Sequence, residues 1–408
     1  MNAGEKMVIG VIGGGASGMA AALAAAENEN VQVVLFERQA RLGRKLQATG
    51  NGRCNLSNLN ANEGAYYGDA PDFAAAALSA FDVKRTLEWF GDLGLFTVAE
   101  PSGRVYPYSD QANSVVDVLR FALEKRNIRQ ELGFEITKLR RTEDGFILDG
   151  SGGSVKCDKV IVACGGLAGT KLGGSMSGYQ LLRSMGHQMT RLRPALVQLK
   201  CGWNGISGLK GVRANCRAQV LCDGEIRAES AGEIQFTEYG LSGPVVFEIS
   251  RDVCQGKGNW VCRLDLLPEH TDAQLRNALQ RRTSTALPTE ELLTGILHNR
   301  LGRVLTKAVG IPVNRPISEL TARQLEDVCA AVKGFEIPLT EPLGMDSAQV
   351  TAGGIRTDEF DPSTMESKLV PGLYACGEVL DIDGQCGGYN LQWAWSSGRC
   401  AGSAAGKG

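Results

Sequence analysis

The sequence MVIGVIGGGASG at residues 7–18 decides the fold class. Its apolar first half predicts a buried parallel strand, and Gly13, Gly15 and Gly18 match the pattern G-x-G-x-x-G. In that pattern the first glycine permits a tight turn, the second lets the backbone approach a pyrophosphate, and the third lets a helix pack close to the strand. The stretch therefore predicts the start of a Rossmann-like α/β domain.

The residues that follow complete one Rossmann half. An Ala-rich helix is predicted over residues 19–27, and Ala16 and Ser17 at its start would present free N–H groups to phosphates. An apolar strand over residues 31–36 then ends at Glu37, 19 positions after the last glycine of the pattern. A carboxylate at that place binds a ribose diol and disfavours a 2′-phosphate. The first half thus predicts an adenine dinucleotide, either NAD or FAD, and disfavours NADP.

Three further segments favour FAD. The first, residues 38–55, is basic and then rich in Gly and Asn; its basic side chains would neutralise phosphates and its later residues would line a ring. The second, residues 159–166, is an apolar strand ending in paired glycines. The third, residues 372–402, adds a strand, an acid that would bind ribityl hydroxyls, and a helix whose N-terminus would stabilise negative charge on a reduced flavin. The cofactor-binding residues expected in these segments are Arg38, Arg44, Lys45, Thr49, Gly50, Asn51, Arg53, Asn55, Ala163, Gly165, Gly166, Gly377, Glu378, Asp383, Gly388, Tyr389, Asn390 and Leu391.

Composition limits the class of protein. The 408 residues suggest two or three domains at about 150 residues per domain. The net charge of -2 gives no reason to expect a nucleic-acid partner. Twelve cysteines without a secretory signal indicate a reducing, cytoplasmic location. The three histidines are isolated, so no metal site is expected, and no apolar stretch is long enough to span a membrane. The sequence leaves the oligomeric state open.

The chain is expected to divide into three parts. Residues 1–190 and 345–408 would form a discontinuous FAD-binding domain of the two-dinucleotide-binding type. Alternating apolar residues predict an inserted antiparallel β-barrel-like substrate domain over residues 191–268. Residues 269–344 would form a helical subdomain. Within it the spacing predicts helices over 272–279, 290–297, 301–309 and 321–332, with Thr271 and Thr321 as N-caps.

Several long runs resemble one known family. They are GRKLQATGNGRCNLSN (43–58), GRVYPYSDQANSVVDVL (103–119), GEIQFTEYGLSGPVVFEIS (232–250), VTAGGI (350–355) and MESKLVPGLYACGEVLDIDGQCGGYNLQWAWSSG (365–398). On these runs the whole chain resembles the bacterial three-domain NAD(P)/FAD-dependent oxidoreductases, which include 3-dehydro-bile-acid Δ4,6-reductase-like flavoproteins. Cys386 stands where that family pattern is expected to have Thr.

The resemblance implies a reductase of conjugated C=C bonds in 3-oxo steroid or bile-acid-like substrates. Hydride would pass from NAD(P)H to the flavin and from flavin N5 to a small hydrophobic substrate, and an acid would supply the proton. Candidate proton donors are Tyr389, Tyr106, Tyr108 and Tyr239, and Arg53 could polarise a carbonyl. No second strand–GxGxxG–helix unit is evident for NAD(P)H, so the nicotinamide would bind in the flavin cleft or another donor would serve.

Two alternatives remain open at this stage. One is an FAD oxidase or dehydrogenase acting on a small amine or another polar metabolite. The other is a flavin-binding protein that modifies or escorts RNA, which the near-neutral charge disfavours.

Overall fold

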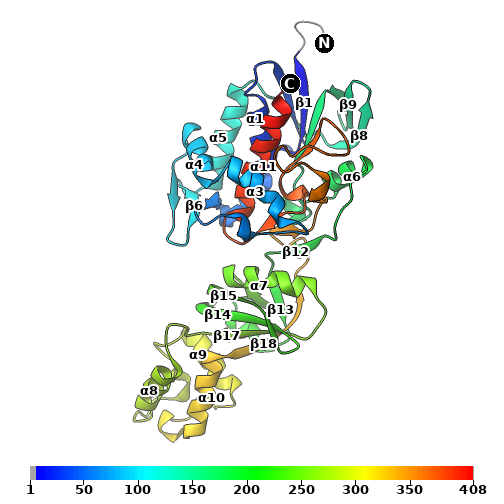
Figure 1. Cartoon of the computed structure of the whole chain (residues 1–408). Coiled ribbons are helices and arrows are strands. Elements are labelled where there is room, and N and C mark those ends of the chain that lie inside the picture. The colour runs from blue at the N-terminus through cyan, green and yellow to red at the C-terminus, as the bar shows by residue number, and fades with distance from the viewer. Residues whose placement is uncertain (1–5, 408) are drawn as a thin grey trace. The chain divides into compact units, whose positions relative to one another are not determined.

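The computed structural model describes residues 6–407, and these form two compact units (Figure 1). The Rossmann unit comprises residues 6–193 and 349–407, and the barrel unit comprises residues 194–348. Each unit has its own hydrophobic core.

A five-stranded parallel sheet forms the centre of the Rossmann unit. Its strand order is β20-β11-β1-β2-β7, and every neighbouring pair is parallel. The strands are β1 (Met7–Ile12), β2 (Val31–Glu37), β7 (Arg129–Leu132), β11 (Lys159–Val162) and β20 (Leu373–Ala375). The near-continuous apolar sequences of β1, β2 and β11 suit strands that are buried on both faces. The expected Rossmann-like α/β fold is confirmed, including the return of the C-terminal segment to the sheet.

Helices from the two ends of the chain pack backbone to backbone. Helix α1 (Ala16–Ala25) lies beside α11 (Tyr389–Gly406) (Figure 1). A Cβ atom at Gly398 or Gly402 would overlap a carbonyl oxygen of α1, that of Ser17 or of Ala21. Only glycine permits such close approach of two helix backbones.

Shorter elements surround this centre. The remaining helices of the unit are α2 (Arg44–Ala48), α3 (Ala74–Ala80), α4 (Val83–Asp92), α5 (Ala112–Lys125) and α6 (Ser177–Ser184). Small antiparallel sheets are formed by β3 (Ser57–Asn58), β6 (Arg104–Pro107) and β5 (Thr97–Ala99), by β8 (Ile136–Thr142), β9 (Gly145–Gly150) and β10 (Gly153–Cys157), and by β4 (Tyr66–Tyr67) with β21 (Asp383–Gly384).

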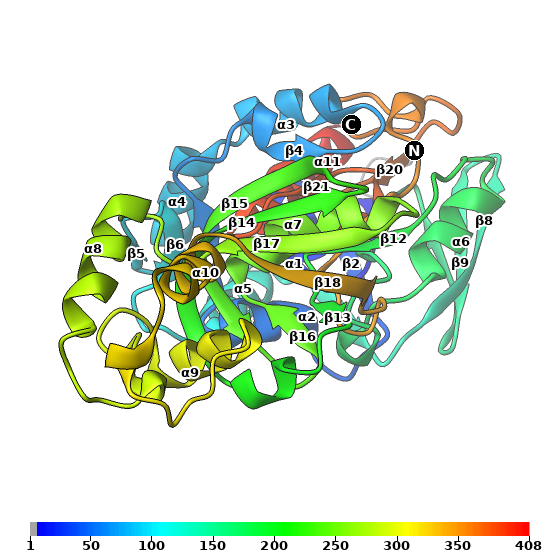
Figure 2. The same ribbon diagram turned by 90° about the horizontal axis from the view of Figure 1, so that it is seen from below.

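The barrel unit is built on a closed antiparallel barrel with the strand order β13-β16-β15-β14-β17-β18 (Figure 2). Along β18, Phe335, Ile337 and Leu339 are buried and alternate with exposed residues, which is the pattern of a strand with one face in a core. The expected inserted β domain is therefore confirmed. Its strands are β13 (Leu199–Cys201), β14 (Arg213–Cys222), β15 (Glu225–Phe236), β16 (Gly240–Ser242), β17 (Trp260–Asp265) and β18 (Phe335–Pro342).

Three helices lie between β17 and β18 in the chain: α8 (Asp272–Arg282), α9 (Asn299–Ala308) and α10 (Ala322–Lys333). Thr271 and Thr321 cap α8 and α10, each in a reciprocal capping box with the glutamine three residues later. The three helices predicted from apolar spacing at these places are confirmed.

The structure differs from the sequence interpretation in the remainder of this unit. Residues 290–297 do not form the expected helix; only a 3-10 turn over Thr289–Glu291 is present, and the N–H groups of Thr289 and Glu290 bond to carbonyls of Arg315 and Val313. The Arg282 guanidinium binds carbonyl oxygens of the same segment and holds it in a turn.

Two other elements were not expected where they occur. Residues 244–255, inside the range assigned to the β-barrel-like domain, form helix α7 (Pro244–Gln255), and Pro244 is its first residue, a position where the missing N–H costs nothing. Residues 335–342, inside the range assigned to a helical subdomain, form strand β18, which pairs with β13 and β17 and closes the barrel.

Candidate functional site

The glycine turn between β1 and α1 has the geometry that the motif requires. Gly13 has a φ of 112°, and a Cβ atom at Gly18 would overlap the Gly13 carbonyl oxygen. Gly15 differs, because no heavy atom lies within 4 Å of the position its Cβ atom would take. Gly15 is also the N-cap of α1, with no side chain bonded to the N–H groups of the first turn, which include those of Ala16 and Ser17. The turn thus presents open space in front of free backbone donors.

Glu37 lies beside this turn at the end of β2. Its Oε2 atom accepts a hydrogen bond from the Gly14 N–H at 2.8 Å, and its Oε1 atom accepts one from the Gln39 N–H at 2.8 Å. Both carboxylate oxygens are therefore fixed at the edge of the glycine turn. Each oxygen keeps a further lone pair that can accept from a hydroxyl group.

The basic side chains of residues 38–45 have different hydrogen-bond and ion-pair partners. The Arg38 guanidinium donates to the Gly173 carbonyl at 2.7 Å, and Arg44 donates to the Gln39 side chain at 2.8 Å. Lys45 forms an ion pair with Glu378 at 2.8 Å across 333 positions of sequence. Glu378 also accepts from the Thr351 N–H at 2.8 Å. Two residues expected separately to bind the cofactor thus contact each other.

The segment 49–55, expected to line the flavin ring, lies beside the start of α11, whose N-terminus is expected to face the same ring. Gly50 and Asn51 have φ values of 58° and 56°, and a Cβ atom at Gly50 would lie 3.5 Å from the Tyr106 ring. The Asn55 Oδ1 atom is buried and has no hydrogen-bond partner among the described residues. A Cβ atom at Gly388, at the start of α11, would lie 2.9 Å from that oxygen. A buried acceptor without a donor is costly and is typical of a position that a ligand satisfies.

Tyr106 and Arg53 form one cluster. The Arg53 guanidinium lies 4.0 Å from the centre of the Tyr106 ring and pairs with both Asp110 and Glu100. Burial of the Tyr106 phenol, together with the nearby Glu100 carboxylate, raises its pKa against the opposing effect of Arg104 and Arg53. The Tyr106 hydroxyl therefore keeps its proton at neutral pH, as a proton donor must.

The other candidate proton donors lie in three different surroundings. Tyr389 is buried at the start of α11, and its carbonyl accepts from the Tyr66 hydroxyl at 3.0 Å. Tyr108 is 75% exposed. Tyr239 belongs to the barrel unit, where its hydroxyl donates to Gln198 at 2.6 Å. Of the four, Tyr106 and Tyr389 lie in the segments that meet around Asn55.

The remaining expected residues occupy the same unit. The Thr49 hydroxyl donates to the Leu46 carbonyl, the Asn390 side chain bridges the backbone of Gly384 and Gln385, and Asp383 is buried. A Cβ atom at Gly166 would overlap the Glu378 carboxylate, and one at Gly377 would lie 2.5 Å from the Ser17 hydroxyl. Ala163 is buried, Gly165 has a φ of 70°, and Leu391 is half-buried.

Two cysteines near these segments carry protonated thiols. Burial raises the pKa of Cys54 and of Cys376 to about 12 in each case. Because the thiolate is the reactive form, neither is a nucleophile at neutral pH. All twelve cysteines lie within residues 6–407, and none of them takes part in a disulfide.

Sequence reasoning missed Arg104. This residue lies on β6, within the quoted run GRVYPYSDQANSVVDVL, and its Nε atom would be 2.8 Å from a Cβ atom at Gly387. Asn58, also missed, donates from Nδ2 to the Gly387 carbonyl at 2.8 Å. The sequence signal that could have identified Arg104 is its place two positions before Tyr106 on one strand, because residues i and i+2 of a strand share a face.

Comparison with known protein families identifies the family of this chain. Residues 7–404 match the family described as the HI0933-like protein Rossmann domain. The chain belongs to this family. The match spans nearly the whole chain and agrees with the flavoprotein oxidoreductase family expected from the sequence runs.

Two curated relatives match this HI0933-like protein over nearly their full lengths. It is 43% identical over 403 residues to the 3-dehydro-bile acid delta(4,6)-reductase of Clostridium scindens, covering 97% of this chain and 98% of the relative. It is 32% identical over 390 residues to the ribosomal RNA dihydrouridine synthase of Escherichia coli, covering 95% of each. Among solved structures, 3-ketosteroid delta1-dehydrogenase from Sterolibacterium denitrificans matches with a TM-score of 0.53 and 12% identity, over 98% of this chain and 99% of that one. That likeness shows a shared fold.

The HI0933-like chain is thus a flavoprotein oxidoreductase, and its Rossmann unit fits FAD. The open space at Gly15, the free N–H groups of α1 and the fixed Glu37 carboxylate suit the pyrophosphate and ribose of an adenine dinucleotide. The partnerless Asn55 oxygen, between the two ring segments, offers an acceptor to an N–H group such as the one on a flavin pyrimidine ring. Residues of one unit therefore offer groups suited to both ends of FAD.

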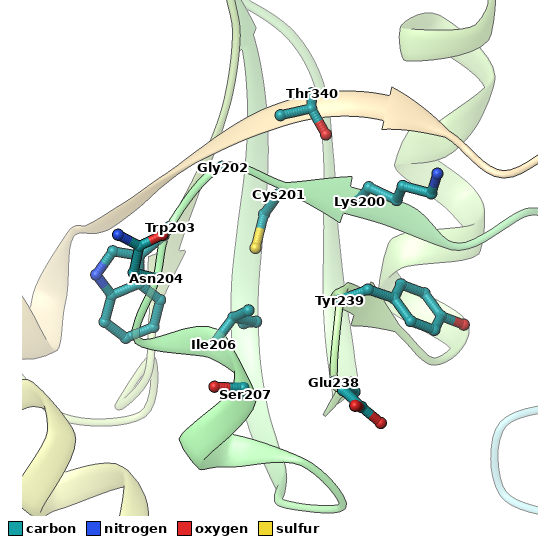
Figure 3. A pocket seen from close by; sticks show the side chains of 10 residues that line it. All are labelled: Lys200, Cys201, Gly202, Trp203, Asn204, Ile206, Ser207, Glu238, Tyr239 and Thr340. Atoms are coloured by element: carbon teal, nitrogen blue, oxygen red, sulfur yellow. The ribbon is translucent and has the colours of Figure 1, made fainter.

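The barrel unit carries a separate pocket of about 390 Å³ (Figure 3). Both apolar and charged side chains line it, among them Lys200, Cys201, Trp203, Ile206, Glu238 and Tyr239. Its volume lies in the range of small-molecule sites. Over residues 6–407, no helix is long and apolar enough to cross a membrane. The same residues contain no cluster of three or more His, Cys, Asp or Glu side chains arranged to hold a metal ion.

Proposed function

We propose that this protein is an NAD(P)H-linked reductase of conjugated C=C bonds in 3-oxo steroid or bile-acid-like substrates. The observation that carries this proposal is the 43% identity to a 3-dehydro-bile acid delta(4,6)-reductase across almost the whole of both chains. The name of the second relative supports the same bond type, since dihydrouridine is uridine reduced at a C=C bond conjugated to a carbonyl. Reduction of an enone-like bond is thus the chemistry common to both names.

The residues of the Rossmann unit would divide the work as follows. The first turn of α1 would hold the pyrophosphate, Glu37 the ribose, and the segments around Asn55 and Gly388 the ring. Bound FAD would supply the transfer of hydride. Tyr106 is the preferred proton donor, because its ring is buried beside Gly50 in the segment expected to line the flavin, and Tyr389 is the second candidate.

A test of this proposal begins with the absorbance spectrum of the purified protein, which should show bound flavin. Under anaerobic conditions NADH or NADPH should bleach the flavin, and a 3-oxo-Δ4 steroid or 3-oxo-Δ4,6 bile acid should restore the oxidised spectrum. Product analysis should find the substrate heavier by two hydrogens. If an amine bleaches the oxidised protein and no enone reoxidises the reduced one, the chain is a dehydrogenase or oxidase of small polar metabolites instead.

Ribosomal RNA modification is the second candidate, favoured by the 32% identity to a dihydrouridine synthase. The ion pairs on the barrel strands disfavour binding of RNA. Arg213, Arg217 and Arg263 on the barrel strands each pair with a glutamate, at 3.4, 3.9 and 2.7 Å respectively. Arginines neutralised in this way offer little to a phosphate backbone. Reoxidation of the reduced protein by unmodified ribosomal RNA, with dihydrouridine formed in the RNA, would favour this candidate over the steroid reductase.

A further inference from the structure

Arg104 is a half-buried guanidinium without a carboxylate partner. Among the described residues of the Rossmann unit, no carboxylate lies within ion-pair distance of its nitrogens, and the guanidinium donates no hydrogen bond. It lies on β6 two residues before Tyr106, so both side chains extend from the same face of the strand. A half-buried guanidinium that has lost part of its hydration and has no acceptor in the protein is suited to bind the oxygen of a ligand.

The position of this guanidinium is built into the fold. Asn58 on β3 pairs in register with Arg104, and its side chain donates to the Gly387 carbonyl at 2.8 Å. The strand and the turn before α11 are thereby tied together. Gly387 has no side chain, and a Cβ atom there would lie 2.8 Å from Arg104 Nε, so the glycine makes room for the guanidinium against the turn.

Arg53, the neighbouring arginine, differs because its guanidinium is already ion-paired. Arg53 pairs with Asp110 and with Glu100, the latter at 3.2 Å. Glu100 is opposite Arg104 across the hairpin, where its N–H donates to the Arg104 carbonyl at 2.8 Å, yet its carboxylate is bound to Arg53. Of the two guanidinium groups near Tyr106, Arg104 is therefore the one that keeps its N–H donors for an incoming oxygen.

We propose that Arg104 forms an oxyanion subsite that binds the carbonyl oxygen of the conjugated substrate. This inference rests on the proposed function. When hydride adds to the β-carbon of an enone, the C=C π pair shifts to form an enolate and the carbonyl oxygen takes the negative charge. Tyr106 then gives a proton to the α-carbon and the C=O bond re-forms. The substrate has gained one hydrogen and two electrons as hydride from the reduced cofactor, and one hydrogen as the proton from the acid. Arg104 binds the oxygen while it carries the charge, and Tyr106 stands beside it as the proton donor.

A stable anion can test the subsite without turnover. Pentafluorophenol is ionised at neutral pH and imitates the flat ring and charged oxygen of a cyclic enolate. Its binding to the FAD-loaded protein can be followed by ¹⁹F NMR, and pentafluoroanisole supplies the same ring without the charge. We expect Arg104→Gln to weaken phenolate binding roughly 10-fold or more, as loss of a charged hydrogen bond does. Arg104→Lys, which keeps the charge but loses the planar fork, should fall between wild type and Arg104→Gln.

The matched control is Arg120→Gln, which removes the same charge from α5, where Arg120 pairs with Asp117 and Glu124. It should bind the phenolate within twofold of wild type, and neither variant should alter pentafluoroanisole binding. Flavin absorbance and circular dichroism verify that each variant is folded. Equal phenolate affinity in wild type, Arg104→Gln and Arg120→Gln overturns the subsite. If the phenolate requires Arg104 but no enone is reduced, the subsite stands and the proposed substrate class fails.

Discussion

Both units of this chain have a hydrophobic core, but they differ in which elements bring backbone against backbone. In the Rossmann unit, backbone meets backbone where Gly18 faces the Gly13 carbonyl and where Gly398 and Gly402 face α1. In the barrel unit, the closest such contact lies between two strands of the barrel, where a Cβ atom at Gly240 would overlap the Leu199 carbonyl oxygen, and side chains fill the barrel. Where backbone lies directly against backbone, an added Cβ atom has no room, whereas a core formed by side chains tolerates small changes in volume. The difference explains why the short glycine motif indicates function and the longer barrel sequence does not.

Gly18→Ala should have the largest effect. Its Cβ atom would overlap the Gly13 carbonyl oxygen, which neither chain segment can move away from without breaking the turn. We expect destabilisation of roughly 3 kcal/mol or more and loss of bound flavin. Urea unfolding and flavin absorbance measure both. The control in the barrel unit is Gly208→Ala, where the nearest atom, Val304 Cγ2, is 3.9 Å away and the effect should be below about 0.5 kcal/mol. Similar unfolding of both variants would remove the contrast between the units.

Phe236→Ala tests the side-chain core of the barrel unit. Phe236 on β15 is fully buried, so the truncation leaves a cavity and should cost about 3–5 kcal/mol. The folded fraction should keep its flavin spectrum, because every residue expected to bind FAD lies in the other unit. Ile226→Ala, on the same strand but 54% exposed, should change the unfolding free energy by less than about 0.5 kcal/mol. An unchanged unfolding midpoint for Phe236→Ala would show that this core is not tightly packed.

Gly15→Ala separates cofactor binding from folding within the Rossmann unit. Gly15 has a φ of -83°, which alanine adopts freely, and its Cβ atom would enter open space. The apoprotein should unfold as wild type does, while FAD binding should weaken roughly 10-fold, or about 1.4 kcal/mol, because the methyl group occupies room in front of the α1 donors. Fluorescence titration with FAD measures the affinity. Wild-type affinity in this variant would place the pyrophosphate elsewhere.

His187 should give the smallest effect, which depends on pH. Its ring lies between Glu359 at 2.7 Å and Ser367 at 2.9 Å, and burial lowers its pKa despite the opposing effect of Glu359. The unfolded chain then takes up the proton first, near pH 6.5. Stability should therefore fall as the pH drops below about 6.5 until the folded-state pKa is reached, with a slope of at most about 1.4 kcal/mol per pH unit.

Unfolding experiments at several pH values can assign this slope to His187. His187→Gln should remove its contribution, whereas His270→Gln, on the exposed surface of the barrel unit, should keep it. The same slope in wild type and His187→Gln would assign the pH dependence to other groups.

Local patterns sufficed for much of this structure. The glycine turn, Glu37 at the end of β2 and the capping boxes of Thr271 and Thr321 follow from spacing of a few residues. The fold class also followed, because the C-terminal run could be recognised as a second part of the same domain. Helix α7 was missed because Pro244 both breaks and begins helices, and only the residues after it decide which.

Contacts between segments far apart in the sequence could not be predicted from local patterns. The pairing of Lys45 with Glu378 joins residues 333 positions apart, and nothing near either residue specifies the other. Both had been assigned separately to the cofactor on the strength of local motifs. The same holds for Arg104, whose place beside Gly387 depends on the pairing of β3 with β6. Sequence patterns indicate which side chains are chemically suitable, whereas tertiary pairing decides which of them are already neutralised.

The packing of α11 against α1 also has a consequence for synthesis of the chain on the ribosome. The barrel unit is complete once residue 348 has been made, but the edge strand β20 and the glycine-bearing helix α11 emerge only afterwards. Until then β11 has an open edge and the small-residue surface of α1 has no cover, which is the kind of exposed surface that chaperones bind. The barrel unit can therefore fold before the Rossmann unit, because the last helix, which carries residues expected to bind the flavin, is synthesised at the end.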